Sequence, residues 1–91
     1  MRLKVPPDVA SLIRNMHPHL KNRVRAGLNQ VLGNPDTGKF LRFELEGLRS
    51  FRIGKFRLIY RLKQDVIEIV ALGPRARIYE ETYRLIKKDE V

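Results

Sequence analysis

Two stretches near the start of the chain carry apolar residues at helical spacing. In the first stretch they recur at i, i+3, i+4 and i+7, the pattern of one helix face. These positions are Val9, Leu12, Ile13 and Met16, and those of the second stretch are Leu20, Val24, Leu28, Val31 and Leu32. The pattern predicts two amphipathic helices, separated by His17-Pro18 and preceded by a short strand at residues 2–5. Gly33-Asn34-Pro35 is typical of a helix stop, with glycine in the left-handed position after the last turn.

From residue 39 onward, apolar and polar positions alternate, which indicates strands. Ile53-Gly54-Lys55-Phe56 is typical of a two-residue hairpin, because glycine at the first central position suits a type II′ turn. Followed outward, this register places Arg52 opposite Arg57 and Phe51 opposite Leu58. The hairpin therefore presents one apolar face and one face that carries two arginines.

A second turn at Gln64-Asp65 extends the same register into a third strand. Its predicted pairs are Tyr60 with Ile69, Arg61 with Glu68, Leu58 with Ala71, and Arg57 with Leu72. Phe51, Ile53, Phe56, Leu58 and Tyr60 of the hairpin then share one apolar face with Ile67, Ile69 and Ala71 of the third strand. We expect the two amphipathic helices to cover this face, because their apolar stripes need a surface to pack on.

Residues 80–88 are expected to form a short helix that brings Tyr79, Tyr83 and Ile86 over the other face of the sheet. The sequence therefore predicts an α+β fold, in which two N-terminal helices pack on one face of a small, mostly antiparallel sheet of about four strands, with a short C-terminal helix. The 91 residues (1–91) are expected to form a single domain, because a chain of this length supports one small core.

The chain is strongly basic, with 19 Lys and Arg residues against 10 Asp and Glu, a formal charge of +9. Such a charge favours an anionic partner, with nucleic acid as the first candidate. The absence of cysteine excludes a disulfide framework and cysteine-type zinc or iron–sulfur sites. No apolar run has the roughly 20 residues of a membrane span, and the first residues lack the apolar core of a signal peptide. We therefore expect a cytoplasmic protein with no membrane partner.

The arginines of the predicted hairpin form the strongest candidate site. Like charges opposite each other on neighbouring strands cost about 0.2–1 kcal/mol, which an anion bound between Arg52 and Arg57 would offset. The third strand ends beside this pair, so Arg75 and Arg77 are expected to emerge close to it, followed by Tyr79. Guanidinium groups donate paired hydrogen bonds to phosphate. The alternative is that these arginines extend into water without a ligand.

Other candidate chemistry is weaker. His17 and His19 have no Asp, Glu or Cys within six residues, so we interpret them as a surface pair and predict no metal site. Tyr60 falls on the core face of the predicted sheet. Phe40 and Phe43 are expected to pack against other apolar residues, with stacking on RNA bases as the alternative.

Residues 45–60, LEGLRSFRIGKFRLIY, resemble the central signature of the RelE/ParE toxin superfamily. In that signature a leucine–glycine turn and a basic strand precede a tight hairpin and an aromatic-Arg-x-x-Tyr element. Residues 73–79, GPRARIY, are similar to the later Gly-x-Arg…Tyr element of the family. The layout of two helices followed by antiparallel strands agrees as well, so the resemblance covers nearly the full chain.

The resemblance implies the toxin of a type II toxin–antitoxin system. RelE-like members occupy the ribosomal A site and cut mRNA without a metal: the 2′-hydroxyl attacks the adjacent phosphate and leaves a 2′,3′-cyclic phosphate or its hydrolysis product. The implied partners are mRNA, the ribosome and a cognate acidic antitoxin. No small-molecule cofactor is expected.

The same resemblance assigns roles to individual residues. Arg52, Arg57 and Arg75 match the contacts to the phosphate and the transition state. Tyr79 matches the aromatic residue that stacks on a base or assists proton transfer. These four form the predicted catalytic set, and the basic residues predicted to bind RNA around it are Lys39, Arg49, Lys55 and Arg77.

One position departs from the family pattern. RelE-like nucleases often have a second basic residue two positions after the one matching Arg52, where this chain has Gly54. Lys55 is the neighbouring residue that could replace it. The departure leaves two alternatives open: a ParE-like inhibitor that poisons DNA gyrase by protein contact, and a basic RNA-binding module without toxicity.

Overall fold

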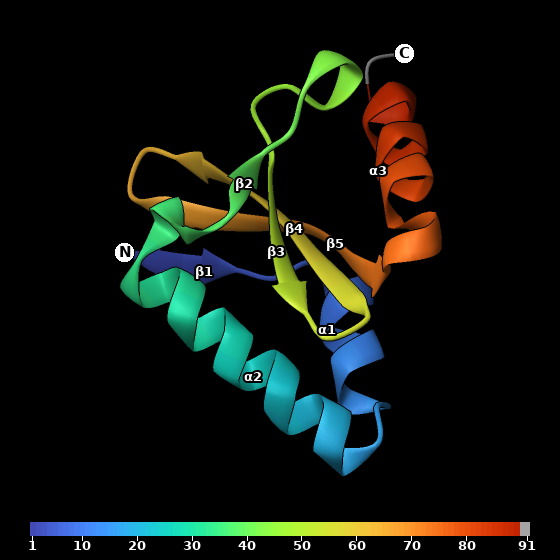
Figure 1. Ribbon diagram of the computed structural model, residues 1–91. Helices are drawn as coiled ribbons and strands as arrows, with labels where there is room; N and C mark the ends of the chain where they lie inside the picture. The colour runs from blue at the N-terminus through green and yellow to red at the C-terminus, as the bar shows by residue number, and fades with distance from the viewer. Residues whose placement is uncertain (90–91) are drawn as a thin grey trace.

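The computed structural model describes residues 1–89 and contains a five-stranded sheet with three α-helices (Figure 1). In chain order, the elements are β1 (Arg2–Lys4), α1 (Pro7–Arg14), α2 (Pro18–Gly33), the 3-10 helix η1 (Pro35–Thr37), β2 (Lys39–Phe40), the 3-10 helix η2 (Phe43–Leu45), β3 (Arg49–Ile53), β4 (Phe56–Lys63), β5 (Val66–Pro74) and α3 (Arg75–Asp89). Within the described residues, no helix has the length and apolar composition needed to cross a bilayer. The predicted α+β class is confirmed.

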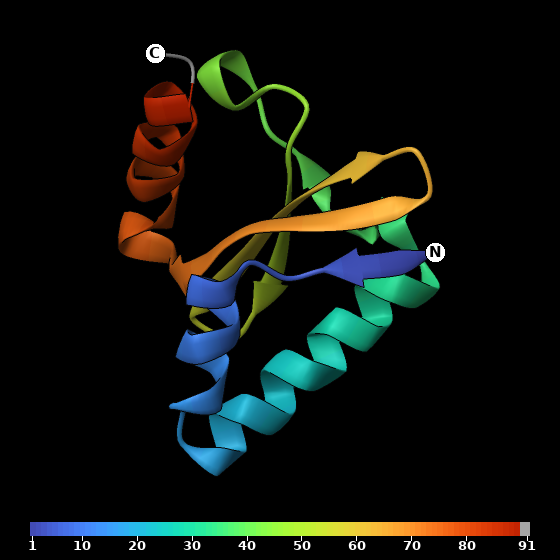
Figure 2. The same ribbon diagram turned by 180° about the vertical axis from the view of Figure 1, so that it is seen from behind.

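The strands follow the order β1-β5-β4-β3-β2. Neighbouring strands are antiparallel except β1 and β5, which run parallel. The sheet therefore has five strands where about four were predicted, and the N-terminal strand makes it mixed. Helices α1 and α2 pack on one face and α3 packs on the other, beside the end of β5 (Figures 1 and 2).

The register predicted from the two turns is confirmed near both of them. Arg52 lies opposite Arg57 across the first hairpin, and Tyr60 lies opposite Ile69 across the second. Gly54 has a φ of +59°, as the first central position of a type II′ turn requires.

The predicted register fails in the second half of β5, where a β-bulge adds one residue to that strand. Leu58 therefore pairs with Leu72 instead of Ala71, and Arg57 pairs with Gly73 instead of Leu72. An extra residue reverses the alternation of side chains beyond it. Leu72 consequently joins the core under α1 and α2, whereas Ala71 joins the cluster under α3.

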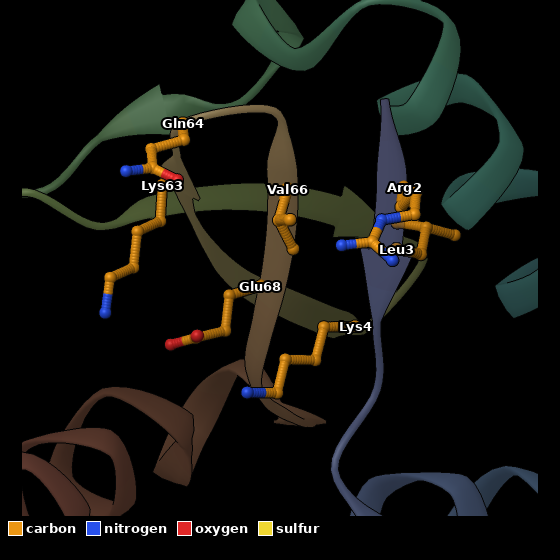
Figure 3. Close-up of a pocket in the computed structure, with 7 residues that line it drawn as sticks. All are labelled: Arg2, Leu3, Lys4, Lys63, Gln64, Val66 and Glu68. Atoms are coloured by element: carbon orange, nitrogen blue, oxygen red, sulfur yellow. The ribbon is translucent and has the colours of Figure 1, made fainter.

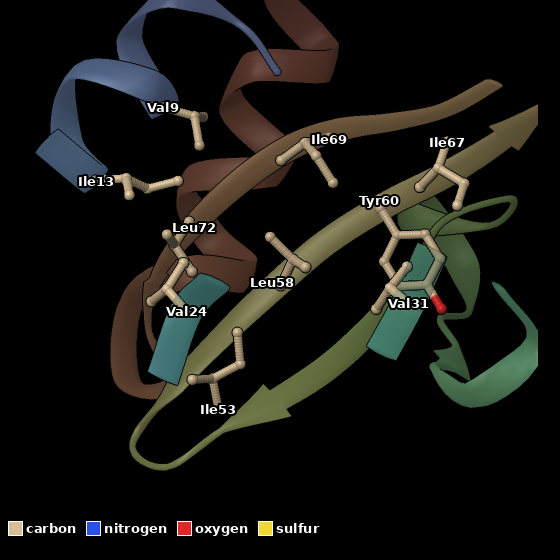
Figure 4. Close-up of a cluster of buried hydrophobic side chains, with 10 residues drawn as sticks. All are labelled: Val9, Ile13, Val24, Val31, Ile53, Leu58, Tyr60, Ile67, Ile69 and Leu72. Carbon is tan, nitrogen blue, oxygen red and sulfur yellow. The ribbon is translucent and has the colours of Figure 1, made fainter. Parts of the chain in front are cut away.

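Side chains from both N-terminal helices form the larger core with one face of the sheet. Val9, Ile13, Val24 and Val31 are at most 9% exposed. They pack against Ile53, Leu58, Tyr60, Ile67, Ile69 and Leu72 (Figure 4). Each buried side chain of this size contributes about 1.5–3 kcal/mol. The predicted helical stripes thus face this core, with Leu12, at 43% exposure, as the exception.

Helix α2 ends without the predicted left-handed glycine. Gly33 is the last helical residue and Asn34, with φ −149°, already leaves the helix. Pro35 lacks an N–H and disfavours helical backbone in the residue before it. The Asn34 side chain then accepts a hydrogen bond from the backbone N–H of Asp36 at 3.2 Å. Asparagine and proline therefore end the helix, and η1 follows at once.

Helix α3 begins at Arg75 rather than at residue 80, directly after β5. Between residues 75 and 88, Ile78 and Thr82 are its buried residues. Tyr79 packs in part against the second cluster, as predicted, whereas Tyr83 stays 36% exposed. The early start places Arg75 and Arg77, which were expected to emerge at the end of the third strand, on the first turn of a helix.

Candidate functional site

A cavity of about 510 Å³ lies where β2, β3, β4 and α3 meet, and we call it the basic groove. Its lining residues are Thr37, Lys39, Phe40, Leu41, Ser50, Phe51, Arg52, Arg57, Arg75 and Tyr79. The lining thus contains four cationic side chains and no carboxylate. The groove brings together all four residues of the predicted catalytic set, from two strands and a helix.

The two arginines of the hairpin differ in how firmly they are held. Arg57 donates through Nη1 to the carbonyl of Gly54 at 3.2 Å and to its neighbour Phe56 at 3.0 Å. Arg52 has no such bond within the described residues and is exposed. Neither arginine forms an ion pair with any described side chain. Their positive charges are therefore free to act on an anion in the groove.

Arg75 reaches the groove because the start of α3 is tied to the hairpin. Its backbone N–H donates to the carbonyl of Lys55 at 2.9 Å. An adjoining cavity of about 670 Å³ shares Arg52, Arg57 and Arg75 with the groove and is also lined by Lys55. Lys55, predicted to bind RNA, thus lies beside the groove instead of within it.

The hydroxyl of Tyr79 has a partner that the sequence reasoning missed. It lies 3.1 Å from Oγ of Ser50, close enough for a hydrogen bond. Ser50 is 9% exposed and stands two residues before Arg52 on the same strand, so side-chain alternation places both on one face. The two-residue spacing from Arg52 could have indicated that Ser50 faces the site. The hydrogen bond between Ser50 and Tyr79 of α3 could not be inferred from that spacing.

Arg49, also predicted to bind RNA, is held away from the groove. It pairs with the Asp36 carboxylate at 3.1 Å and donates to the carbonyl of Gly38 at 3.3 Å. Its guanidinium carbon lies 3.8 Å from the centre of the Phe40 ring. Arg77 is exposed on α3 and lines neither the groove nor the cavity beside it. The structure therefore gives neither side chain a place in the groove.

A cation that the sequence reasoning also missed lies against the hairpin turn. A Cβ built on Gly54 would stand only 2.7 Å from Nη2 of Arg23, which comes from α2. Arg23 and Arg52 line one small cavity of about 230 Å³ next to the turn. The space next to Gly54 is thus taken by a guanidinium from another element. Helix α2 also carries Lys21 and Arg25, and the sequence pattern does not mark which of its cations reaches the hairpin.

A separate cavity, also of about 510 Å³, lies at the opposite end of the sheet between β1 and the β4–β5 turn. None of the predicted site residues lines it. In Figure 3, Lys4, Lys63 and Glu68 extend from neighbouring strands toward the same side. Nε of Arg61 donates to Glu68 at 2.6 Å, and this hydrogen bond lowers the pKa of the Glu68 carboxyl. Because its acid is engaged in that ion pair and no aromatic or hydroxyl group lines it, we place the candidate site in the basic groove.

Three aromatic predictions have clear outcomes. Tyr60 is a core residue, fully buried, and its hydroxyl donates to the carbonyl of Pro35 at 2.7 Å. Phe40 and Phe43, expected to pack, are instead 66% and 85% exposed. Phe40 is the last residue of the very short edge strand β2 and Phe43 lies just beyond it, at the edge of the sheet. Within the described residues, no cluster of three His, Asp or Glu side chains is placed to hold a metal ion.

Comparison with known proteins gives matches over most of the chain. The model of the family described as ParE toxin of type II toxin-antitoxin system, parDE, matches residues 7–79. The RelBE2 toxin–antitoxin complex of Mycobacterium tuberculosis has a chain with TM-score 0.71 and 24% identity, covering 81% of this chain and 96% of that one. The archaeal RelE–RelB complex of Pyrococcus horikoshii OT3 gives 0.65 and 25%, covering 84% and 96%.

The free E. coli toxin RelE, as a double mutant, gives a TM-score of 0.71 at 17% identity and covers 98% of this chain and 96% of that one. A search of curated protein sequences gave no match. At such identities the E. coli structure shows a common fold alone. The family match and the shared fold agree on one superfamily.

Proposed function

Because this chain belongs to the ParE toxin family of type II toxin–antitoxin systems, we propose that it acts as a ribosome-dependent endoribonuclease, the activity of the RelE-like branch of the same superfamily. The resemblance inferred from residues 45–60 and 73–79 is confirmed by the family match and the RelE folds. The observation that carries the proposal is the groove in which Arg52, Arg57 and Arg75 share one cavity with Tyr79.

The cations of the groove suit the charge that develops when RNA is cut. Attack of a 2′-hydroxyl on the adjacent phosphate places negative charge on the phosphorane oxygens, and donors held in advance at that place stabilise it. Arg57 is held by its two carbonyl contacts in the hairpin. Arg52 and Arg75 approach from the neighbouring strand and from α3. No carboxylate of the lining competes with the phosphate for them.

Cleavage also moves two protons. The 2′-oxygen loses one as it bonds to phosphorus, and the 5′-oxygen gains one as its bond to phosphorus breaks. Tyrosine hydroxyls are protonated near neutral pH, and we assign to Tyr79 the donation of a proton to the leaving 5′-oxygen, with Ser50 holding its hydroxyl in place. The 2′,3′-cyclic phosphate is the product of this step.

The groove lacks an obvious group to take the proton from the 2′-hydroxyl. Its lining holds neither a carboxylate nor a histidine, and Lys and Arg are ordinarily charged at neutral pH. Alignment of the 2′-oxygen with phosphorus must therefore supply a large part of the rate. A ribosome that holds mRNA in its A site provides such alignment, and this is why we expect free RNA to be a poor substrate.

Two cations beside the hairpin turn are proposed to replace the basic residue absent at Gly54. Arg23 lies against the turn from α2, and Lys55 lines the adjoining cavity with Arg52 and Arg57. Both carry charge to the border of the groove without straining the turn. We assign them contacts to RNA phosphates next to the cleaved bond.

The partner that neutralises such a toxin is proposed to be acidic. Two of the similar structures are complexes of RelE with RelB or of RelBE2. For this chain we propose an antitoxin with an acidic, partly disordered segment that folds over the basic groove, because opposite charges steer such a segment to it. Purification of the two proteins together should give one tight complex.

Inhibition of DNA gyrase is the second candidate, and the ParE family match favours it. Such a toxin binds a protein and needs no proton transfer. Tyr79 would then serve as a packing residue, and its hydroxyl would be dispensable.

Two assays on one protein preparation separate these functions. The first is cleavage of mRNA on ribosomes stalled with an empty A site, mapped by primer extension, and the second is DNA supercoiling by gyrase. The proposed function predicts a cut in the A-site codon, little cutting of free mRNA and normal supercoiling. Blocked supercoiling with intact mRNA would select the second candidate.

A further inference from the structure

We propose that Phe40 is a stacking platform for an unpaired base of the bound RNA, and that Arg49 holds the ring in position. The inference rests on the proposed function, since it names an additional contact to the same RNA at the border of the groove. It starts from an apolar ring that folding leaves in water: Phe40 is 66% exposed and borders the basic groove at edge strand β2, with its side chain on the same side of the sheet as that of its cross-strand partner Arg49.

The ring is supported from one side. The guanidinium carbon of Arg49 lies 3.8 Å from the ring centre, and Phe40 and Arg49 are direct cross-strand partners of β2 and β3. The Arg49 side chain is only 12% exposed. It covers one face of the ring, so the exposed area belongs to the other face and the edge.

Arg49 is itself fixed by several contacts. It forms an ion pair with Asp36 at 3.1 Å, and donates to the carbonyls of Gly38 at 3.3 Å and of Asp36 at 3.4 Å. With its hydrogen-bond donors engaged in these contacts, the Arg49 guanidinium is not free to bind RNA phosphate. Arg49 instead holds the Phe40 ring in place, because a cation over the face of an aromatic ring is attracted to that ring.

Phe43 shows that exposure alone does not make such a platform. It is more exposed than Phe40, at 85%, yet it lies outside the groove lining and no cation over its ring is found among the described residues. Phe40 differs by having a cation behind it and by bordering the groove that Arg52 and Arg57 line. Cations that follow the nucleic-acid backbone next to an aromatic ring are the combination by which proteins hold single strands.

Base stacking on an aromatic residue corresponds to about a 5- to 150-fold change in affinity on alanine substitution. The ligand class is therefore single-stranded RNA with an unpaired base next to the phosphate bound by the arginines. Since every base has a stacking face, this contact tolerates different sequences.

The chain has no tryptophan, so a Phe40→Trp variant carries a single indole at the platform, and Phe43→Trp is its matched control. The probe is a short single-stranded oligoribonucleotide with 2′-O-methyl groups, which cannot be cut by attack of the 2′-oxygen. We expect binding to quench the indole of the Phe40→Trp protein strongly and to change the emission of the Phe43→Trp protein little. The control is an oligonucleotide of the same charge that has an abasic site at each position and therefore cannot stack. It should bind more weakly and leave the indole emission of the Phe40→Trp protein unchanged.

Affinity provides the second readout. Phe40→Ala should weaken binding of the intact oligonucleotide about 5- to 150-fold, Phe40→Tyr should retain it, and Phe43→Ala should leave it unchanged. Equal quenching by intact and abasic oligonucleotides, or equal affinity of Phe40→Ala and the unaltered protein, would overturn the platform. So would quenching at position 40 by an acidic peptide alone, which would assign the ring to a protein partner. Base-dependent quenching without mRNA cleavage on ribosomes would overturn the proposed function and leave the platform standing.

Discussion

The hydroxyl oxygens of Ser50 on β3 and Tyr79 on α3 lie 3.1 Å apart, although the two residues are 29 positions apart in the chain. Arg52 is on the same strand and the same face as Ser50. The hydrogen bond therefore fixes the first turn of α3 relative to the strand that carries an arginine of the groove. It sets the position of the hydroxyl to which we assign proton donation.

Removal of the Ser50 hydroxyl should impair catalysis through Tyr79. We expect Ser50→Ala to lower mRNA cleavage about 10- to 100-fold, because a reacting group displaced by about 1 Å loses up to that much. The cost in unfolding free energy should be about 0.5–1.5 kcal/mol, the net value of one hydrogen bond. Cleavage rates on programmed ribosomes and urea denaturation measure the two effects.

A double-mutant cycle distinguishes positioning from general damage. In a Tyr79→Phe background, which has no hydroxyl to orient, Ser50→Ala should cause no further loss of cleavage. Ser50→Thr, which keeps a hydroxyl, should restore most of the activity. Independent, additive losses in the cycle would show that Ser50 does not act through Tyr79.

Substitution of either hairpin arginine should separate activity from stability. Arg52→Ala removes one of two like charges placed directly opposite each other, so the unfolding free energy should rise by about 0.2–1 kcal/mol. Cleavage should fall about 10²- to 10³-fold, the scale of losing one electrostatic group. Arg57→Ala should lose as much activity without gaining stability, because its two bonds to the turn are lost as well.

Arg25 on α2 is the control for net charge, since it is exposed and lines none of the three basic cavities around the hairpin. Arg25→Ala should leave cleavage unchanged. Thermal melting of the three variants beside the unaltered protein is the measurement. A lower melting temperature for Arg52→Ala would contradict the repulsion argument.

The cations beside Gly54 should share the role of the missing basic residue. Lys55→Ala is expected to reduce cleavage by about 10²-fold with little change in stability, because the residue is exposed in a turn. Arg23→Ala should reduce cleavage in the same direction, and the double variant should lose more than either. Single-turnover cleavage on ribosomes measures all three; full activity of both single variants would mean that neither cation contacts the RNA near the scissile bond.

The buried hydroxyl of Tyr60 should limit stability at high pH. It donates to Pro35 and accepts from the backbone N–H of Gly38 at 2.9 Å, and burial raises its pKa above the ordinary 10.0. The folded state therefore prefers the protonated form. The stability that this preference contributes is complete below pH 10.0 and is lost as the pH rises through the higher folded-state pKa.

Tyr60→Phe removes that titration and leaves two backbone groups without a partner. We expect it to cost about 1–3 kcal/mol at neutral pH, but to make the unfolding free energy less dependent on pH above 10.0. Urea denaturation on either side of that pH measures both effects. An unchanged alkaline slope in the variant would mean that Tyr60 is not the group responsible.

Local patterns were sufficient to predict the hairpins. The pairing of Arg52 with Arg57 follows from one glycine turn and a period of two. The bulge in β5 could not be seen, because residues 66–72 are apolar at almost every position and alternation has no readable phase there. The extent of α3 was also misjudged: the helix was expected from residue 80, whereas it begins at Arg75, directly after β5.

The features of the site that could not be predicted depend on contacts between elements that are distant in the chain. The guanidinium of Arg23 reaches Gly54 from α2, and Ser50 meets Tyr79 across the groove. Neither pair has a spacing that a periodic pattern can indicate. Phe40 was expected to pack because it is apolar. Its exposure results from its place on the two-residue edge strand β2, where Arg49 covers one face of the ring only.

Cleavage of mRNA that lacks a single 2′-hydroxyl tests the central claim most directly. Ribosomes are programmed with two mRNAs, identical except that the mapped cleavage site carries either a ribose or a 2′-deoxyribose on the 5′ side of the scissile phosphate. The account predicts rapid cutting of the first mRNA, with a 2′,3′-cyclic phosphate or its hydrolysis product at the new end, and no cutting of the second. Equal cutting of both mRNAs, or no cutting of either, would contradict it.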